Sequence, residues 1–252
     1  MSPIRALRYA RRYRNWRELE RERAAGRAPR RAILRGGVSL EAPEDVNLLS
    51  VVREVFFRRY YTPRGFEIGE RDVVVDIGAN IGAFTVYAAL RTRRRVLAVE
   101  PHPENLRYLE RNLRANGCES AEVAACALTD RDGPVTLQLS PNGACHQLSD
   151  RAFASTRGSI EVPAQRLETV LEQRGLERID LLKLDCEGAE GQILGSASPE
   201  CLARIRRVAL EFHDDASPLS HAELAALLGR SGFATRLEWN GRRPQGYLFA
   251  WR

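Results

Sequence analysis

The stretch "VVVDIGANIGAFTVYAAL", residues 73–90, places a run of valines directly before a glycine turn. Such a β-branched run favours a buried strand, and it ends at Asp76. Gly78 and Gly82 frame the turn, where glycine lets the backbone pass close to a ligand. A helix is predicted from about Gly82. The stretch therefore predicts a strand, a loop and a helix in succession.

The same order of elements recurs directly downstream. The segment "RVLAVEPHPENLRYLERNLRANG", residues 95–117, predicts a strand over 95–100 and then a helix that runs to about Asn116. The segment "AEVAACALTD", residues 121–130, predicts a third strand that ends in a polar turn. A β-α-β-α-β order predicts an α/β fold with a doubly wound, mostly parallel sheet and right-handed connections.

The remaining elements extend this sheet toward the C-terminus. Helices are expected over 46–61 and 166–174, from Ala189, and after the capping residue Ser220. Strands are expected over 179–185 and from 208 to His213, followed by a closing hairpin of 233–239 and 246–252, in which Pro244 weakens the turn. Residues 131–163 predict a β insertion, because short strands flank a polar loop that holds His146. We therefore expect an N-terminal arm over 1–45 and one domain over 46–252.

The composition excludes several classes of protein. The chain has 252 residues, of which 44% are hydrophobic and 29% charged, which is typical of a globular domain with a sizeable core. It contains no run of about 18 apolar residues and no signal-type apolar stretch after the basic N-terminus. We therefore expect a cytoplasmic protein without a transmembrane helix. Five cysteines without a CxxC pair argue against a disulfide framework or a cysteine-rich zinc site.

The positive net charge belongs to the N-terminal arm. Residues 1–35 hold twelve arginines and three glutamates, so the rest of the chain is mildly acidic although the total is +6. Scattered apolar residues, Trp16 and Leu19 among them, predict helix for much of the arm. One interpretation is an arm that binds nucleic acid or an anionic membrane. The favoured one is a solvated helix that docks on the domain, because aromatic interleaving of the RNA-binding kind is missing.

Polar side chains follow the strands of the predicted sheet, at the edge where ligands of doubly wound sheets bind. They are Asp76, Glu100, Asp130, Asp185 and His213. Glu100 lies 22 residues after Gly78, where it can accept hydrogen bonds from ribose hydroxyls. Asp76 would repel a pyrophosphate but attract the ammonium of a methionine moiety, so this edge favours S-adenosylmethionine over NAD. The alternative is a structural turn that binds no ligand.

In order and spacing, "VVVDIGANIG", "VLAVEPHPENLRYLERNL", "IDLLKLDCEGAE" and "VALEFH" resemble the FkbM-type S-adenosylmethionine-dependent methyltransferases over about residues 50–215. The resemblance implies a class I, Rossmann-like methyltransferase fold, with seven strands of which the last is antiparallel. It implies O-methylation of sugar or natural-product hydroxyls. It carries Asp76, Gly78, Asn80, Gly82 and Glu100 over as cofactor contacts. Asp130, which ends the third strand, is added to that set.

The second motif of the resemblance contains Lys183, the single lysine among 39 basic residues, together with Asp185, Glu187 and Glu190. Side chains alternate along a strand, so Lys183 and Asp185 share a face. Lys183 is then either an internal counter-charge for the carboxylates or a group that acts on the acceptor hydroxyl. Glu187, in the loop, is the better catalytic candidate.

His213 ends the neighbouring strand and is a candidate general base. Asp185, Glu211 and His213 could together ligate a metal, but their spacing matches no ligand motif, so no metal is predicted.

We therefore expect an S-adenosylmethionine-dependent methyltransferase that acts on a small molecule or a glycan, with acceptor specificity in the insertion over 131–163. Lys183, Asp185, Glu187 and His213 are the expected catalytic residues. Two alternatives remain: an RNA methyltransferase that uses the basic arm, and a non-catalytic protein that binds S-adenosylmethionine. The residues give no prediction of the acceptor's identity or of the oligomeric state.

Overall fold

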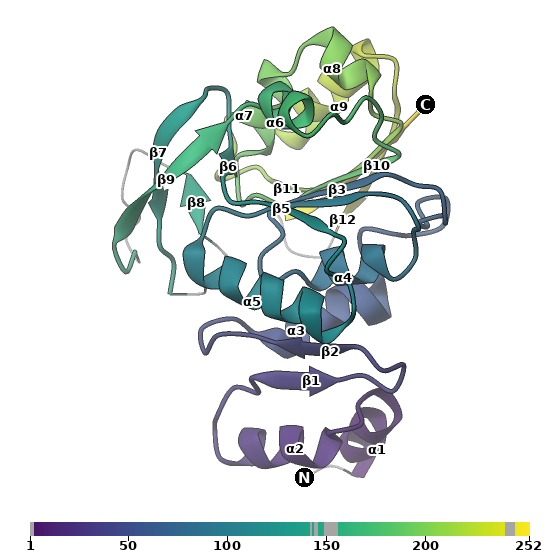
Figure 1. Cartoon of the computed structure of the whole chain (residues 1–252), viewed down its shortest axis with the longest axis vertical. Coiled ribbons are helices and arrows are strands. Elements are labelled where there is room, and N and C mark those ends of the chain that lie inside the picture. The colour runs from purple at the N-terminus through teal and green to yellow at the C-terminus, as the bar shows by residue number, and fades with distance from the viewer. Residues whose placement is uncertain (1–2, 142, 144–145, 149–155, 240–244) are drawn as a thin grey trace.

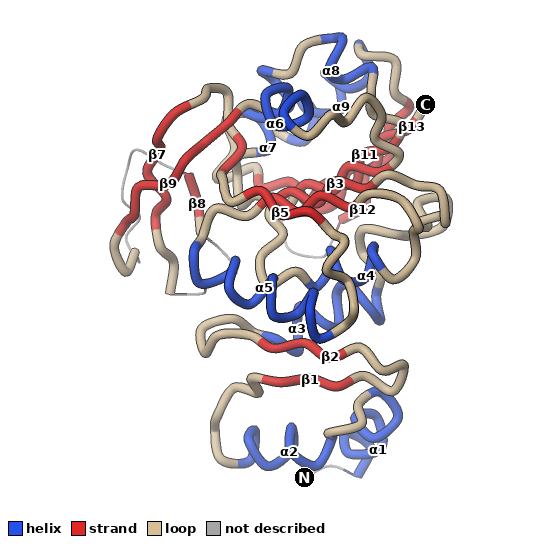
Figure 2. Tube along the Cα trace, in the orientation of Figure 1, coloured by secondary structure: helices blue, strands red, loops and turns tan. Residues whose placement is uncertain are grey.

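A central sheet of seven strands organises the computed structural model, which describes residues 3–141, 143, 146–148, 156–239 and 245–252 (Figures 1 and 2). In spatial order the strands are β12 (Ala234–Trp239), β13 (Gln245–Trp251), β11 (Arg207–His213), β10 (Leu181–Leu184), β3 (Val74–Ile77), β4 (Val96–Val99) and β5 (Glu122–Ala124). Within the described ranges, no helix is long and apolar enough to cross a membrane.

The strand directions agree with the fold expected from the sequence. From β5 to β11 all neighbours are parallel, whereas β13 is antiparallel to both β11 and β12. The last strand therefore runs against the others. The chain passes outward from β3 through β4 to β5 and later returns to β10 on the other side of β3. The point where the strand order reverses, between β3 and β10, is where ligands of open α/β sheets bind.

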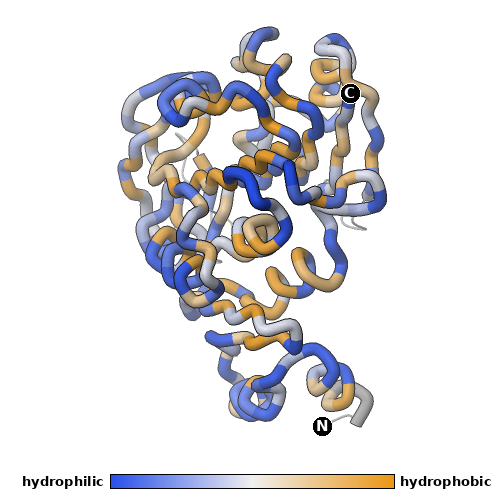
Figure 3. The backbone as a smooth tube through the Cα atoms, turned by 45° about the vertical axis from the view of Figure 1, so that its right-hand side comes forward, coloured by the Kyte–Doolittle hydropathy of each residue, from blue (hydrophilic) through white to orange (hydrophobic). Residues whose placement is uncertain are grey.

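Helices cover both faces of the sheet (Figure 1). One face carries α4 (Ala83–Ala89), α5 (Pro103–Ala115) and α3 (Leu48–Val52), and the other carries α6 (Leu167–Gln173), α7 (Glu190–Ser196), α8 (Pro199–Ala203) and α9 (His221–Arg230). Two apolar clusters result, one on each side of the sheet. The hydropathy colouring accordingly places hydrophobic residues along the central strands (Figure 3). Ser220 begins α9 with a capping box, as its place in the sequence predicts.

The segment over 121–130 is divided between two sheets, whereas the sequence predicts a single strand. After β5, the chain leaves the central sheet and forms β6 (Ala127–Leu128), which pairs with β9 (Ser159–Gln165). The second sheet has the order β6-β9-β7-β8 and includes β7 (Gly133–Gln138) and β8 (Gln147–Leu148). Parts of the polar loop of the predicted insertion, at 142, 144–145 and 149–155, lie outside the described residues. The division carries Asp130 away from the edge of the central sheet.

The N-terminal segment contains more than the expected helix. It forms α1 (Pro3–Arg12) and α2 (Trp16–Ala24), and then a hairpin of β1 (Arg31–Ile33) and β2 (Ser39–Glu41). Two asparagine side chains, one within α5 and one at its C-terminal cap, bind backbone groups on the outer edge of β2. The side chain of Asn112 bonds both the N–H and the C=O of Glu41, and Asn116 does the same with Ser39. The hairpin is thereby fixed to α5.

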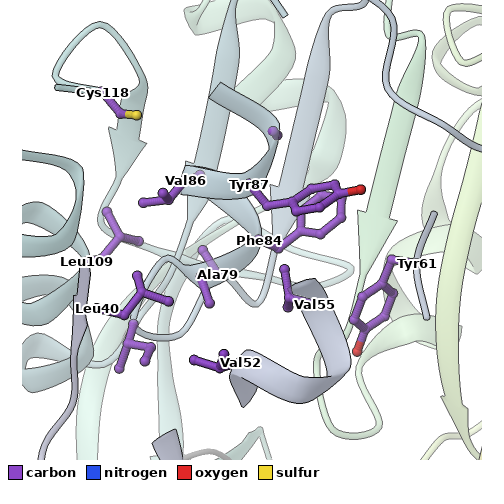
Figure 4. Close-up of a cluster of buried hydrophobic side chains, with 14 of the residues drawn as sticks. Leu40, Val52, Val55, Tyr61, Ala79, Phe84, Val86, Tyr87, Leu109 and Cys118 are labelled. Atoms are coloured by element: carbon purple, nitrogen blue, oxygen red, sulfur yellow. The ribbon is translucent and has the colours of Figure 1, made fainter. Parts of the chain in front are cut away.

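Residues 31–61 share the apolar cluster that lies under α4 and α5. Leu40 of β2, and Val52 and Val55 from the next helical segment, pack with Phe84 and Leu109 (Figure 4). The helix expected over 46–61 divides into α3 and the π-helix η1 (Arg53–Arg58), which ends at Arg59 in the left-handed conformation. The boundary expected at residue 45 therefore does not coincide with a gap in packing.

Candidate active site

The turn after β3 is built from left-handed backbone. Gly78, Asn80 and Gly82 all have positive φ, of 71°, 51° and 79°. At Gly78 a Cβ atom would lie 1.8 Å from the carbonyl oxygen of Asp185, so no side chain fits there. The close approach brings the end of β10 directly against the turn. The two sequence motifs, more than 100 residues apart, thereby form one site.

Glu100 closes the turn from the end of β4. One carboxylate oxygen accepts the backbone N–H of Asn80 at 2.8 Å, and the other accepts the backbone N–H of His102 at 2.9 Å and the side-chain amide of Asn105 at 3.3 Å. Burial raises the pKa of Glu100, and these donors oppose that shift. The carboxylate is thus held in one orientation beside the turn.

Lys183 lies beneath the turn, with its side chain only 4% exposed. Its Nζ is 3.0 Å from Oδ1 of Asp76 and donates to the carbonyl oxygen of Gly78 at 2.9 Å. Burial alone would lower the pKa of Lys183, but the charges of Asp76 and Asp185 outweigh it, so the pKa is raised. The ammonium therefore stays protonated at neutral pH. This charge state favours the counter-charge interpretation over a proton-accepting role.

Tyr61 joins two carboxylates at the ends of β10 and β11. Its hydroxyl lies 2.7 Å from Oδ2 of Asp185 and 2.9 Å from Oε2 of Glu211. One hydroxyl hydrogen cannot serve both acceptors. Burial, followed by the charge of Asp185, raises the pKa of Glu211 to about 8. The raised pKa favours a proton on Glu211, so Glu211 can donate to the Tyr61 oxygen while Tyr61 donates to Asp185.

His213, at the end of β11, lies between two glutamates of the second motif. Its Nδ1 is 3.3 Å from Oε1 of Glu190, and its Nε2 is 3.5 Å from Oε2 of Glu187. Burial lowers the pKa of His213, but the hydrogen bond and charge of Glu190 reverse this and raise it to about 10. Glu187 has a φ of 51°, a conformation that costs a non-glycine residue free energy and that persists where the surroundings impose it.

A cavity of about 550 Å³ opens between these groups at the point where the strand order reverses. Its wall includes Gly78, Asn80 and Glu100 together with Asp185, Glu187 and His213. One chamber therefore contains the glycine turn and the carboxylates at the strand ends. Such a chamber can hold a nucleoside next to a second, hydroxyl-bearing ligand.

Comparison with known proteins identifies the family of the chain. The protein-family model described as the methyltransferase FkbM domain matches residues 76–235. The chain belongs to the FkbM methyltransferase family.

Two curated relatives and one solved structure are similar to this FkbM-family chain. The AMB antimetabolite synthetase AmbE of Pseudomonas aeruginosa is 31% identical over an alignment of 222 residues, which covers 73% of this chain but 10% of that protein. The 31-O-demethyl-FK506 methyltransferase FkbM of Streptomyces tacrolimicus is 31% identical over 215 residues, covering 74% of this chain and 82% of that protein. The crystal structure of methyltransferase FkbM from Methylobacillus flagellatus has a TM-score of 0.54 at 17% identity, covering 93% of this chain and 60% of that one, and supports the fold.

Three of the residues expected to contact the cofactor do not line the cavity of this FkbM methyltransferase. Asp76 is fully buried, and Lys183 and Thr85 occupy its carboxylate, so it is not available to an ammonium group. Gly82 packs against Leu109 of α5. Asp130 is exposed next to the second sheet, where it accepts from Thr129.

The other predicted residues do line the cavity: Gly78, Asn80, Glu100, Lys183, Asp185, Glu187 and His213. Sequence reasoning missed Tyr61, and it considered Glu211 only as a metal ligand. Tyr61 occurs in a segment with helical apolar spacing, which assigns tyrosine to the core. Its ring does pack against Phe84 and Tyr247, and only the hydroxyl reaches the site.

Proposed function

We propose that the protein is an S-adenosylmethionine-dependent O-methyltransferase whose acceptor is a hydroxyl of a sugar or a small natural product. The observation that carries the proposal is the single cavity that joins the glycine turn and Glu100 to the carboxylates that follow β10. Family membership supports methyl transfer.

The residues around the turn fit the nucleoside of the cofactor. Glu100 uses backbone donors for orientation and still has acceptor capacity for ribose hydroxyls, since a carboxylate can accept about four hydrogen bonds. The left-handed turn keeps side chains away from the place where a ligand would approach. When bound, the cofactor supplies a methyl carbon that an acceptor oxygen takes over, while the bonding electron pair stays on sulfur.

The chain's own contribution is to position the acceptor and to receive its proton. Lys183 and His213 are cationic at neutral pH because their pKa values are raised, so neither is suited to take a proton. The carboxylates of Asp185 and Glu187, on the cavity wall, are left to orient the hydroxyl and accept its hydrogen. Alignment of this kind supplies much of the rate in transfer reactions. Tyr61 and Lys183 fix the orientation of Asp185.

Calorimetry with S-adenosylhomocysteine tests the cofactor assignment. We expect the parent protein to bind it, and Glu100→Gln to bind it about 5- to 150-fold more weakly, since ribose hydroxyls lose a charged acceptor worth about 1–3 kcal/mol. Glu104→Gln is the matched control, because Glu104 is exposed on the first turn of α5 and does not line the cavity. Tight binding of NAD with no binding of S-adenosylhomocysteine would contradict the proposal.

A further inference from the structure

Three side chains on the wall of the cavity have the spacing of ligands to a single metal ion. Asp185, Glu187 and His213 each offer one donor atom, and these atoms all lie within 4.8 Å of one another. Donors on one octahedral ion, at metal–ligand distances of about 2.1 Å, are separated by about 3 Å when adjacent and about 4.2 Å when opposite. The separations, none above 4.8 Å, exceed the span of two opposite donors by less than about 1 Å.

The imidazole is held as metal-binding histidines are held. Nδ1 of His213 faces the buried carboxylate of Glu190, which leaves Nε2 directed toward Glu187 at 3.5 Å. A metal ion bound here would displace the Nε2 proton that His213 carries in the metal-free protein. Glu190 is itself fixed by the backbone N–H groups of Cys186 at 2.9 Å and of Gly188 at 3.1 Å. A carboxylate behind the remote ring nitrogen of a ligand histidine is the usual second layer of a metal site.

The two carboxylate ligands lie in the segment that directly follows β10, and the histidine ends the neighbouring strand β11, so the set joins two adjacent strand ends. Asp185 directly follows β10 and accepts the hydroxyl of Tyr61 at 2.7 Å. Glu187 has a left-handed backbone, with a φ of 51°, and its carboxylate lies 3.5 Å from Nε2 of His213. Both carboxylates and the imidazole line the cavity, beside the turn and Glu100.

We propose that Asp185, Glu187 and His213 form a divalent-cation site that takes Mn²⁺ in preference to Mg²⁺ or Ca²⁺. Two carboxylates balance the charge of a divalent ion. The imidazole shifts the preference away from Mg²⁺ and Ca²⁺, which select oxygen ligands. Mn²⁺ also prefers carboxylate oxygens, but it binds nitrogen more tightly than Mg²⁺ does and therefore accepts imidazole as well.

The role of the ion rests on the proposed function. An ion at this position would bind the acceptor oxygen and lower the pKa of its hydroxyl, so the proton can pass to water before or during transfer. Asp185 and Glu187 would then act on the acceptor through the ion. A pair of adjacent hydroxyls, as in sugars, would chelate it. The cavity would thus select acceptors that carry a second oxygen next to the methylated one.

Binding of Mn²⁺ to the full-length protein tests the site without any turnover. Protein stripped with a chelator and saturated with S-adenosylhomocysteine is titrated with Mn²⁺, and free Mn²⁺ is followed by its paramagnetic resonance signal. We expect one saturable ion per chain, at least about tenfold weaker binding in Glu187→Gln and in His213→Gln, and a clear preference over Mg²⁺ and Ca²⁺. Glu187→Gly is a second ligand variant that tolerates the left-handed backbone.

The matched control is His221→Gln. Nδ1 of His221 lies 2.6 Å from Oδ2 of Asp214, so it is also a histidine–carboxylate pair, but it does not line the cavity. Its substitution should leave Mn²⁺ affinity unchanged. Absence of saturable binding, or binding of Mg²⁺ and Mn²⁺ that is equal and unaffected by His213→Gln, would overturn the site and leave His213 as a counter-ion for the carboxylates. Because S-adenosylhomocysteine binding is measured first in every variant, failure of the proposed function is recognised separately.

Discussion

Lys183 is the single lysine in a chain with 39 basic residues, and its surroundings explain why arginine does not serve there. The ammonium fits between a carboxylate oxygen of Asp76 at 3.0 Å and the carbonyl oxygen of Gly78 at 2.9 Å, under the rings of Tyr61 and Phe84. A guanidinium is wider, planar and needs partners in a fixed fork. The sequence identifies the residue as unusual, and the structure shows the size of the space.

Substitution of Lys183 tests this explanation. We expect Lys183→Arg to fold with a lower melting temperature and weaker binding of S-adenosylhomocysteine, because the larger group displaces the turn at Gly78. Lys183→Met should lose more stability, about 3–5 kcal/mol, since it leaves buried Asp76 without a counter-charge. The double variant Asp76→Asn/Lys183→Met should recover part of that loss. A Lys183→Arg protein equal to the parent in melting temperature and affinity would refute the steric argument.

Glu211 predicts a pH dependence of stability. Its pKa is about 8 in the folded protein, above its ordinary value of 4.5, so the folded state binds a proton that the unfolded state releases. Stability from this group is present below pH 4.5 and is lost as the pH rises toward about 8. In chelator, the melting temperature of the parent should therefore fall more steeply over that window than that of Glu211→Gln. Parallel curves for the two proteins would contradict the assignment.

Among the helices and strands, local periodicity of apolar residues predicts the elements whose burial it determines directly. The strand, turn and helix over 73–90 and the parallel order of the first strands follow from it, whereas the antiparallel last strand is expected from the family resemblance. The division of 121–130 between two sheets does not follow from local periodicity. The apolar residues around Cys126 could be buried in either sheet, and only the pairing of β6 with β9 decides that they join the second one. Asp130 therefore lies outside the cavity wall. Asp76 is buried against Lys183 of β10, and local periodicity does not show whether a carboxylate at the end of a strand is buried by the neighbouring strand.

The contact between α5 and the N-terminal hairpin supplies a prediction at the same scale. Asn112 is fully buried and bonds the backbone of Glu41 and the carbonyl oxygen of Ile81. Asn112→Ala leaves these backbone groups without partners and should cost at least about 2 kcal/mol of unfolding free energy, measured by urea denaturation. The control Glu110→Ala, on the exposed side of α5, should cost less than about 0.5 kcal/mol. Equal midpoints for both variants would mean that the hairpin does not contribute to the cooperative core.

At the scale of the whole molecule, basic charge is concentrated at one end of the chain and the cavity lies in the acidic remainder. The helices α1 and α2 carry exposed arginines, among them Arg8, Arg11 and Arg21. If the acceptor is a small molecule, the triple change of these arginines to glutamine should leave turnover and S-adenosylhomocysteine affinity within about twofold of the parent. Turnover that requires RNA, falls steeply with salt and is lost in the triple variant would instead favour a nucleic-acid acceptor, because counterion release would drive binding.

Transfer of a labelled methyl group from S-adenosylmethionine into fractionated small-molecule extract shows whether the protein is an O-methyltransferase. We expect label in a hydroxyl-bearing product as an alkali-stable methyl ether, and at least about a hundredfold loss of rate in Asp185→Asn, which retains S-adenosylhomocysteine binding. Label in RNA, in an alkali-labile ester, or in no product at all from a protein that binds the cofactor would contradict the proposed function.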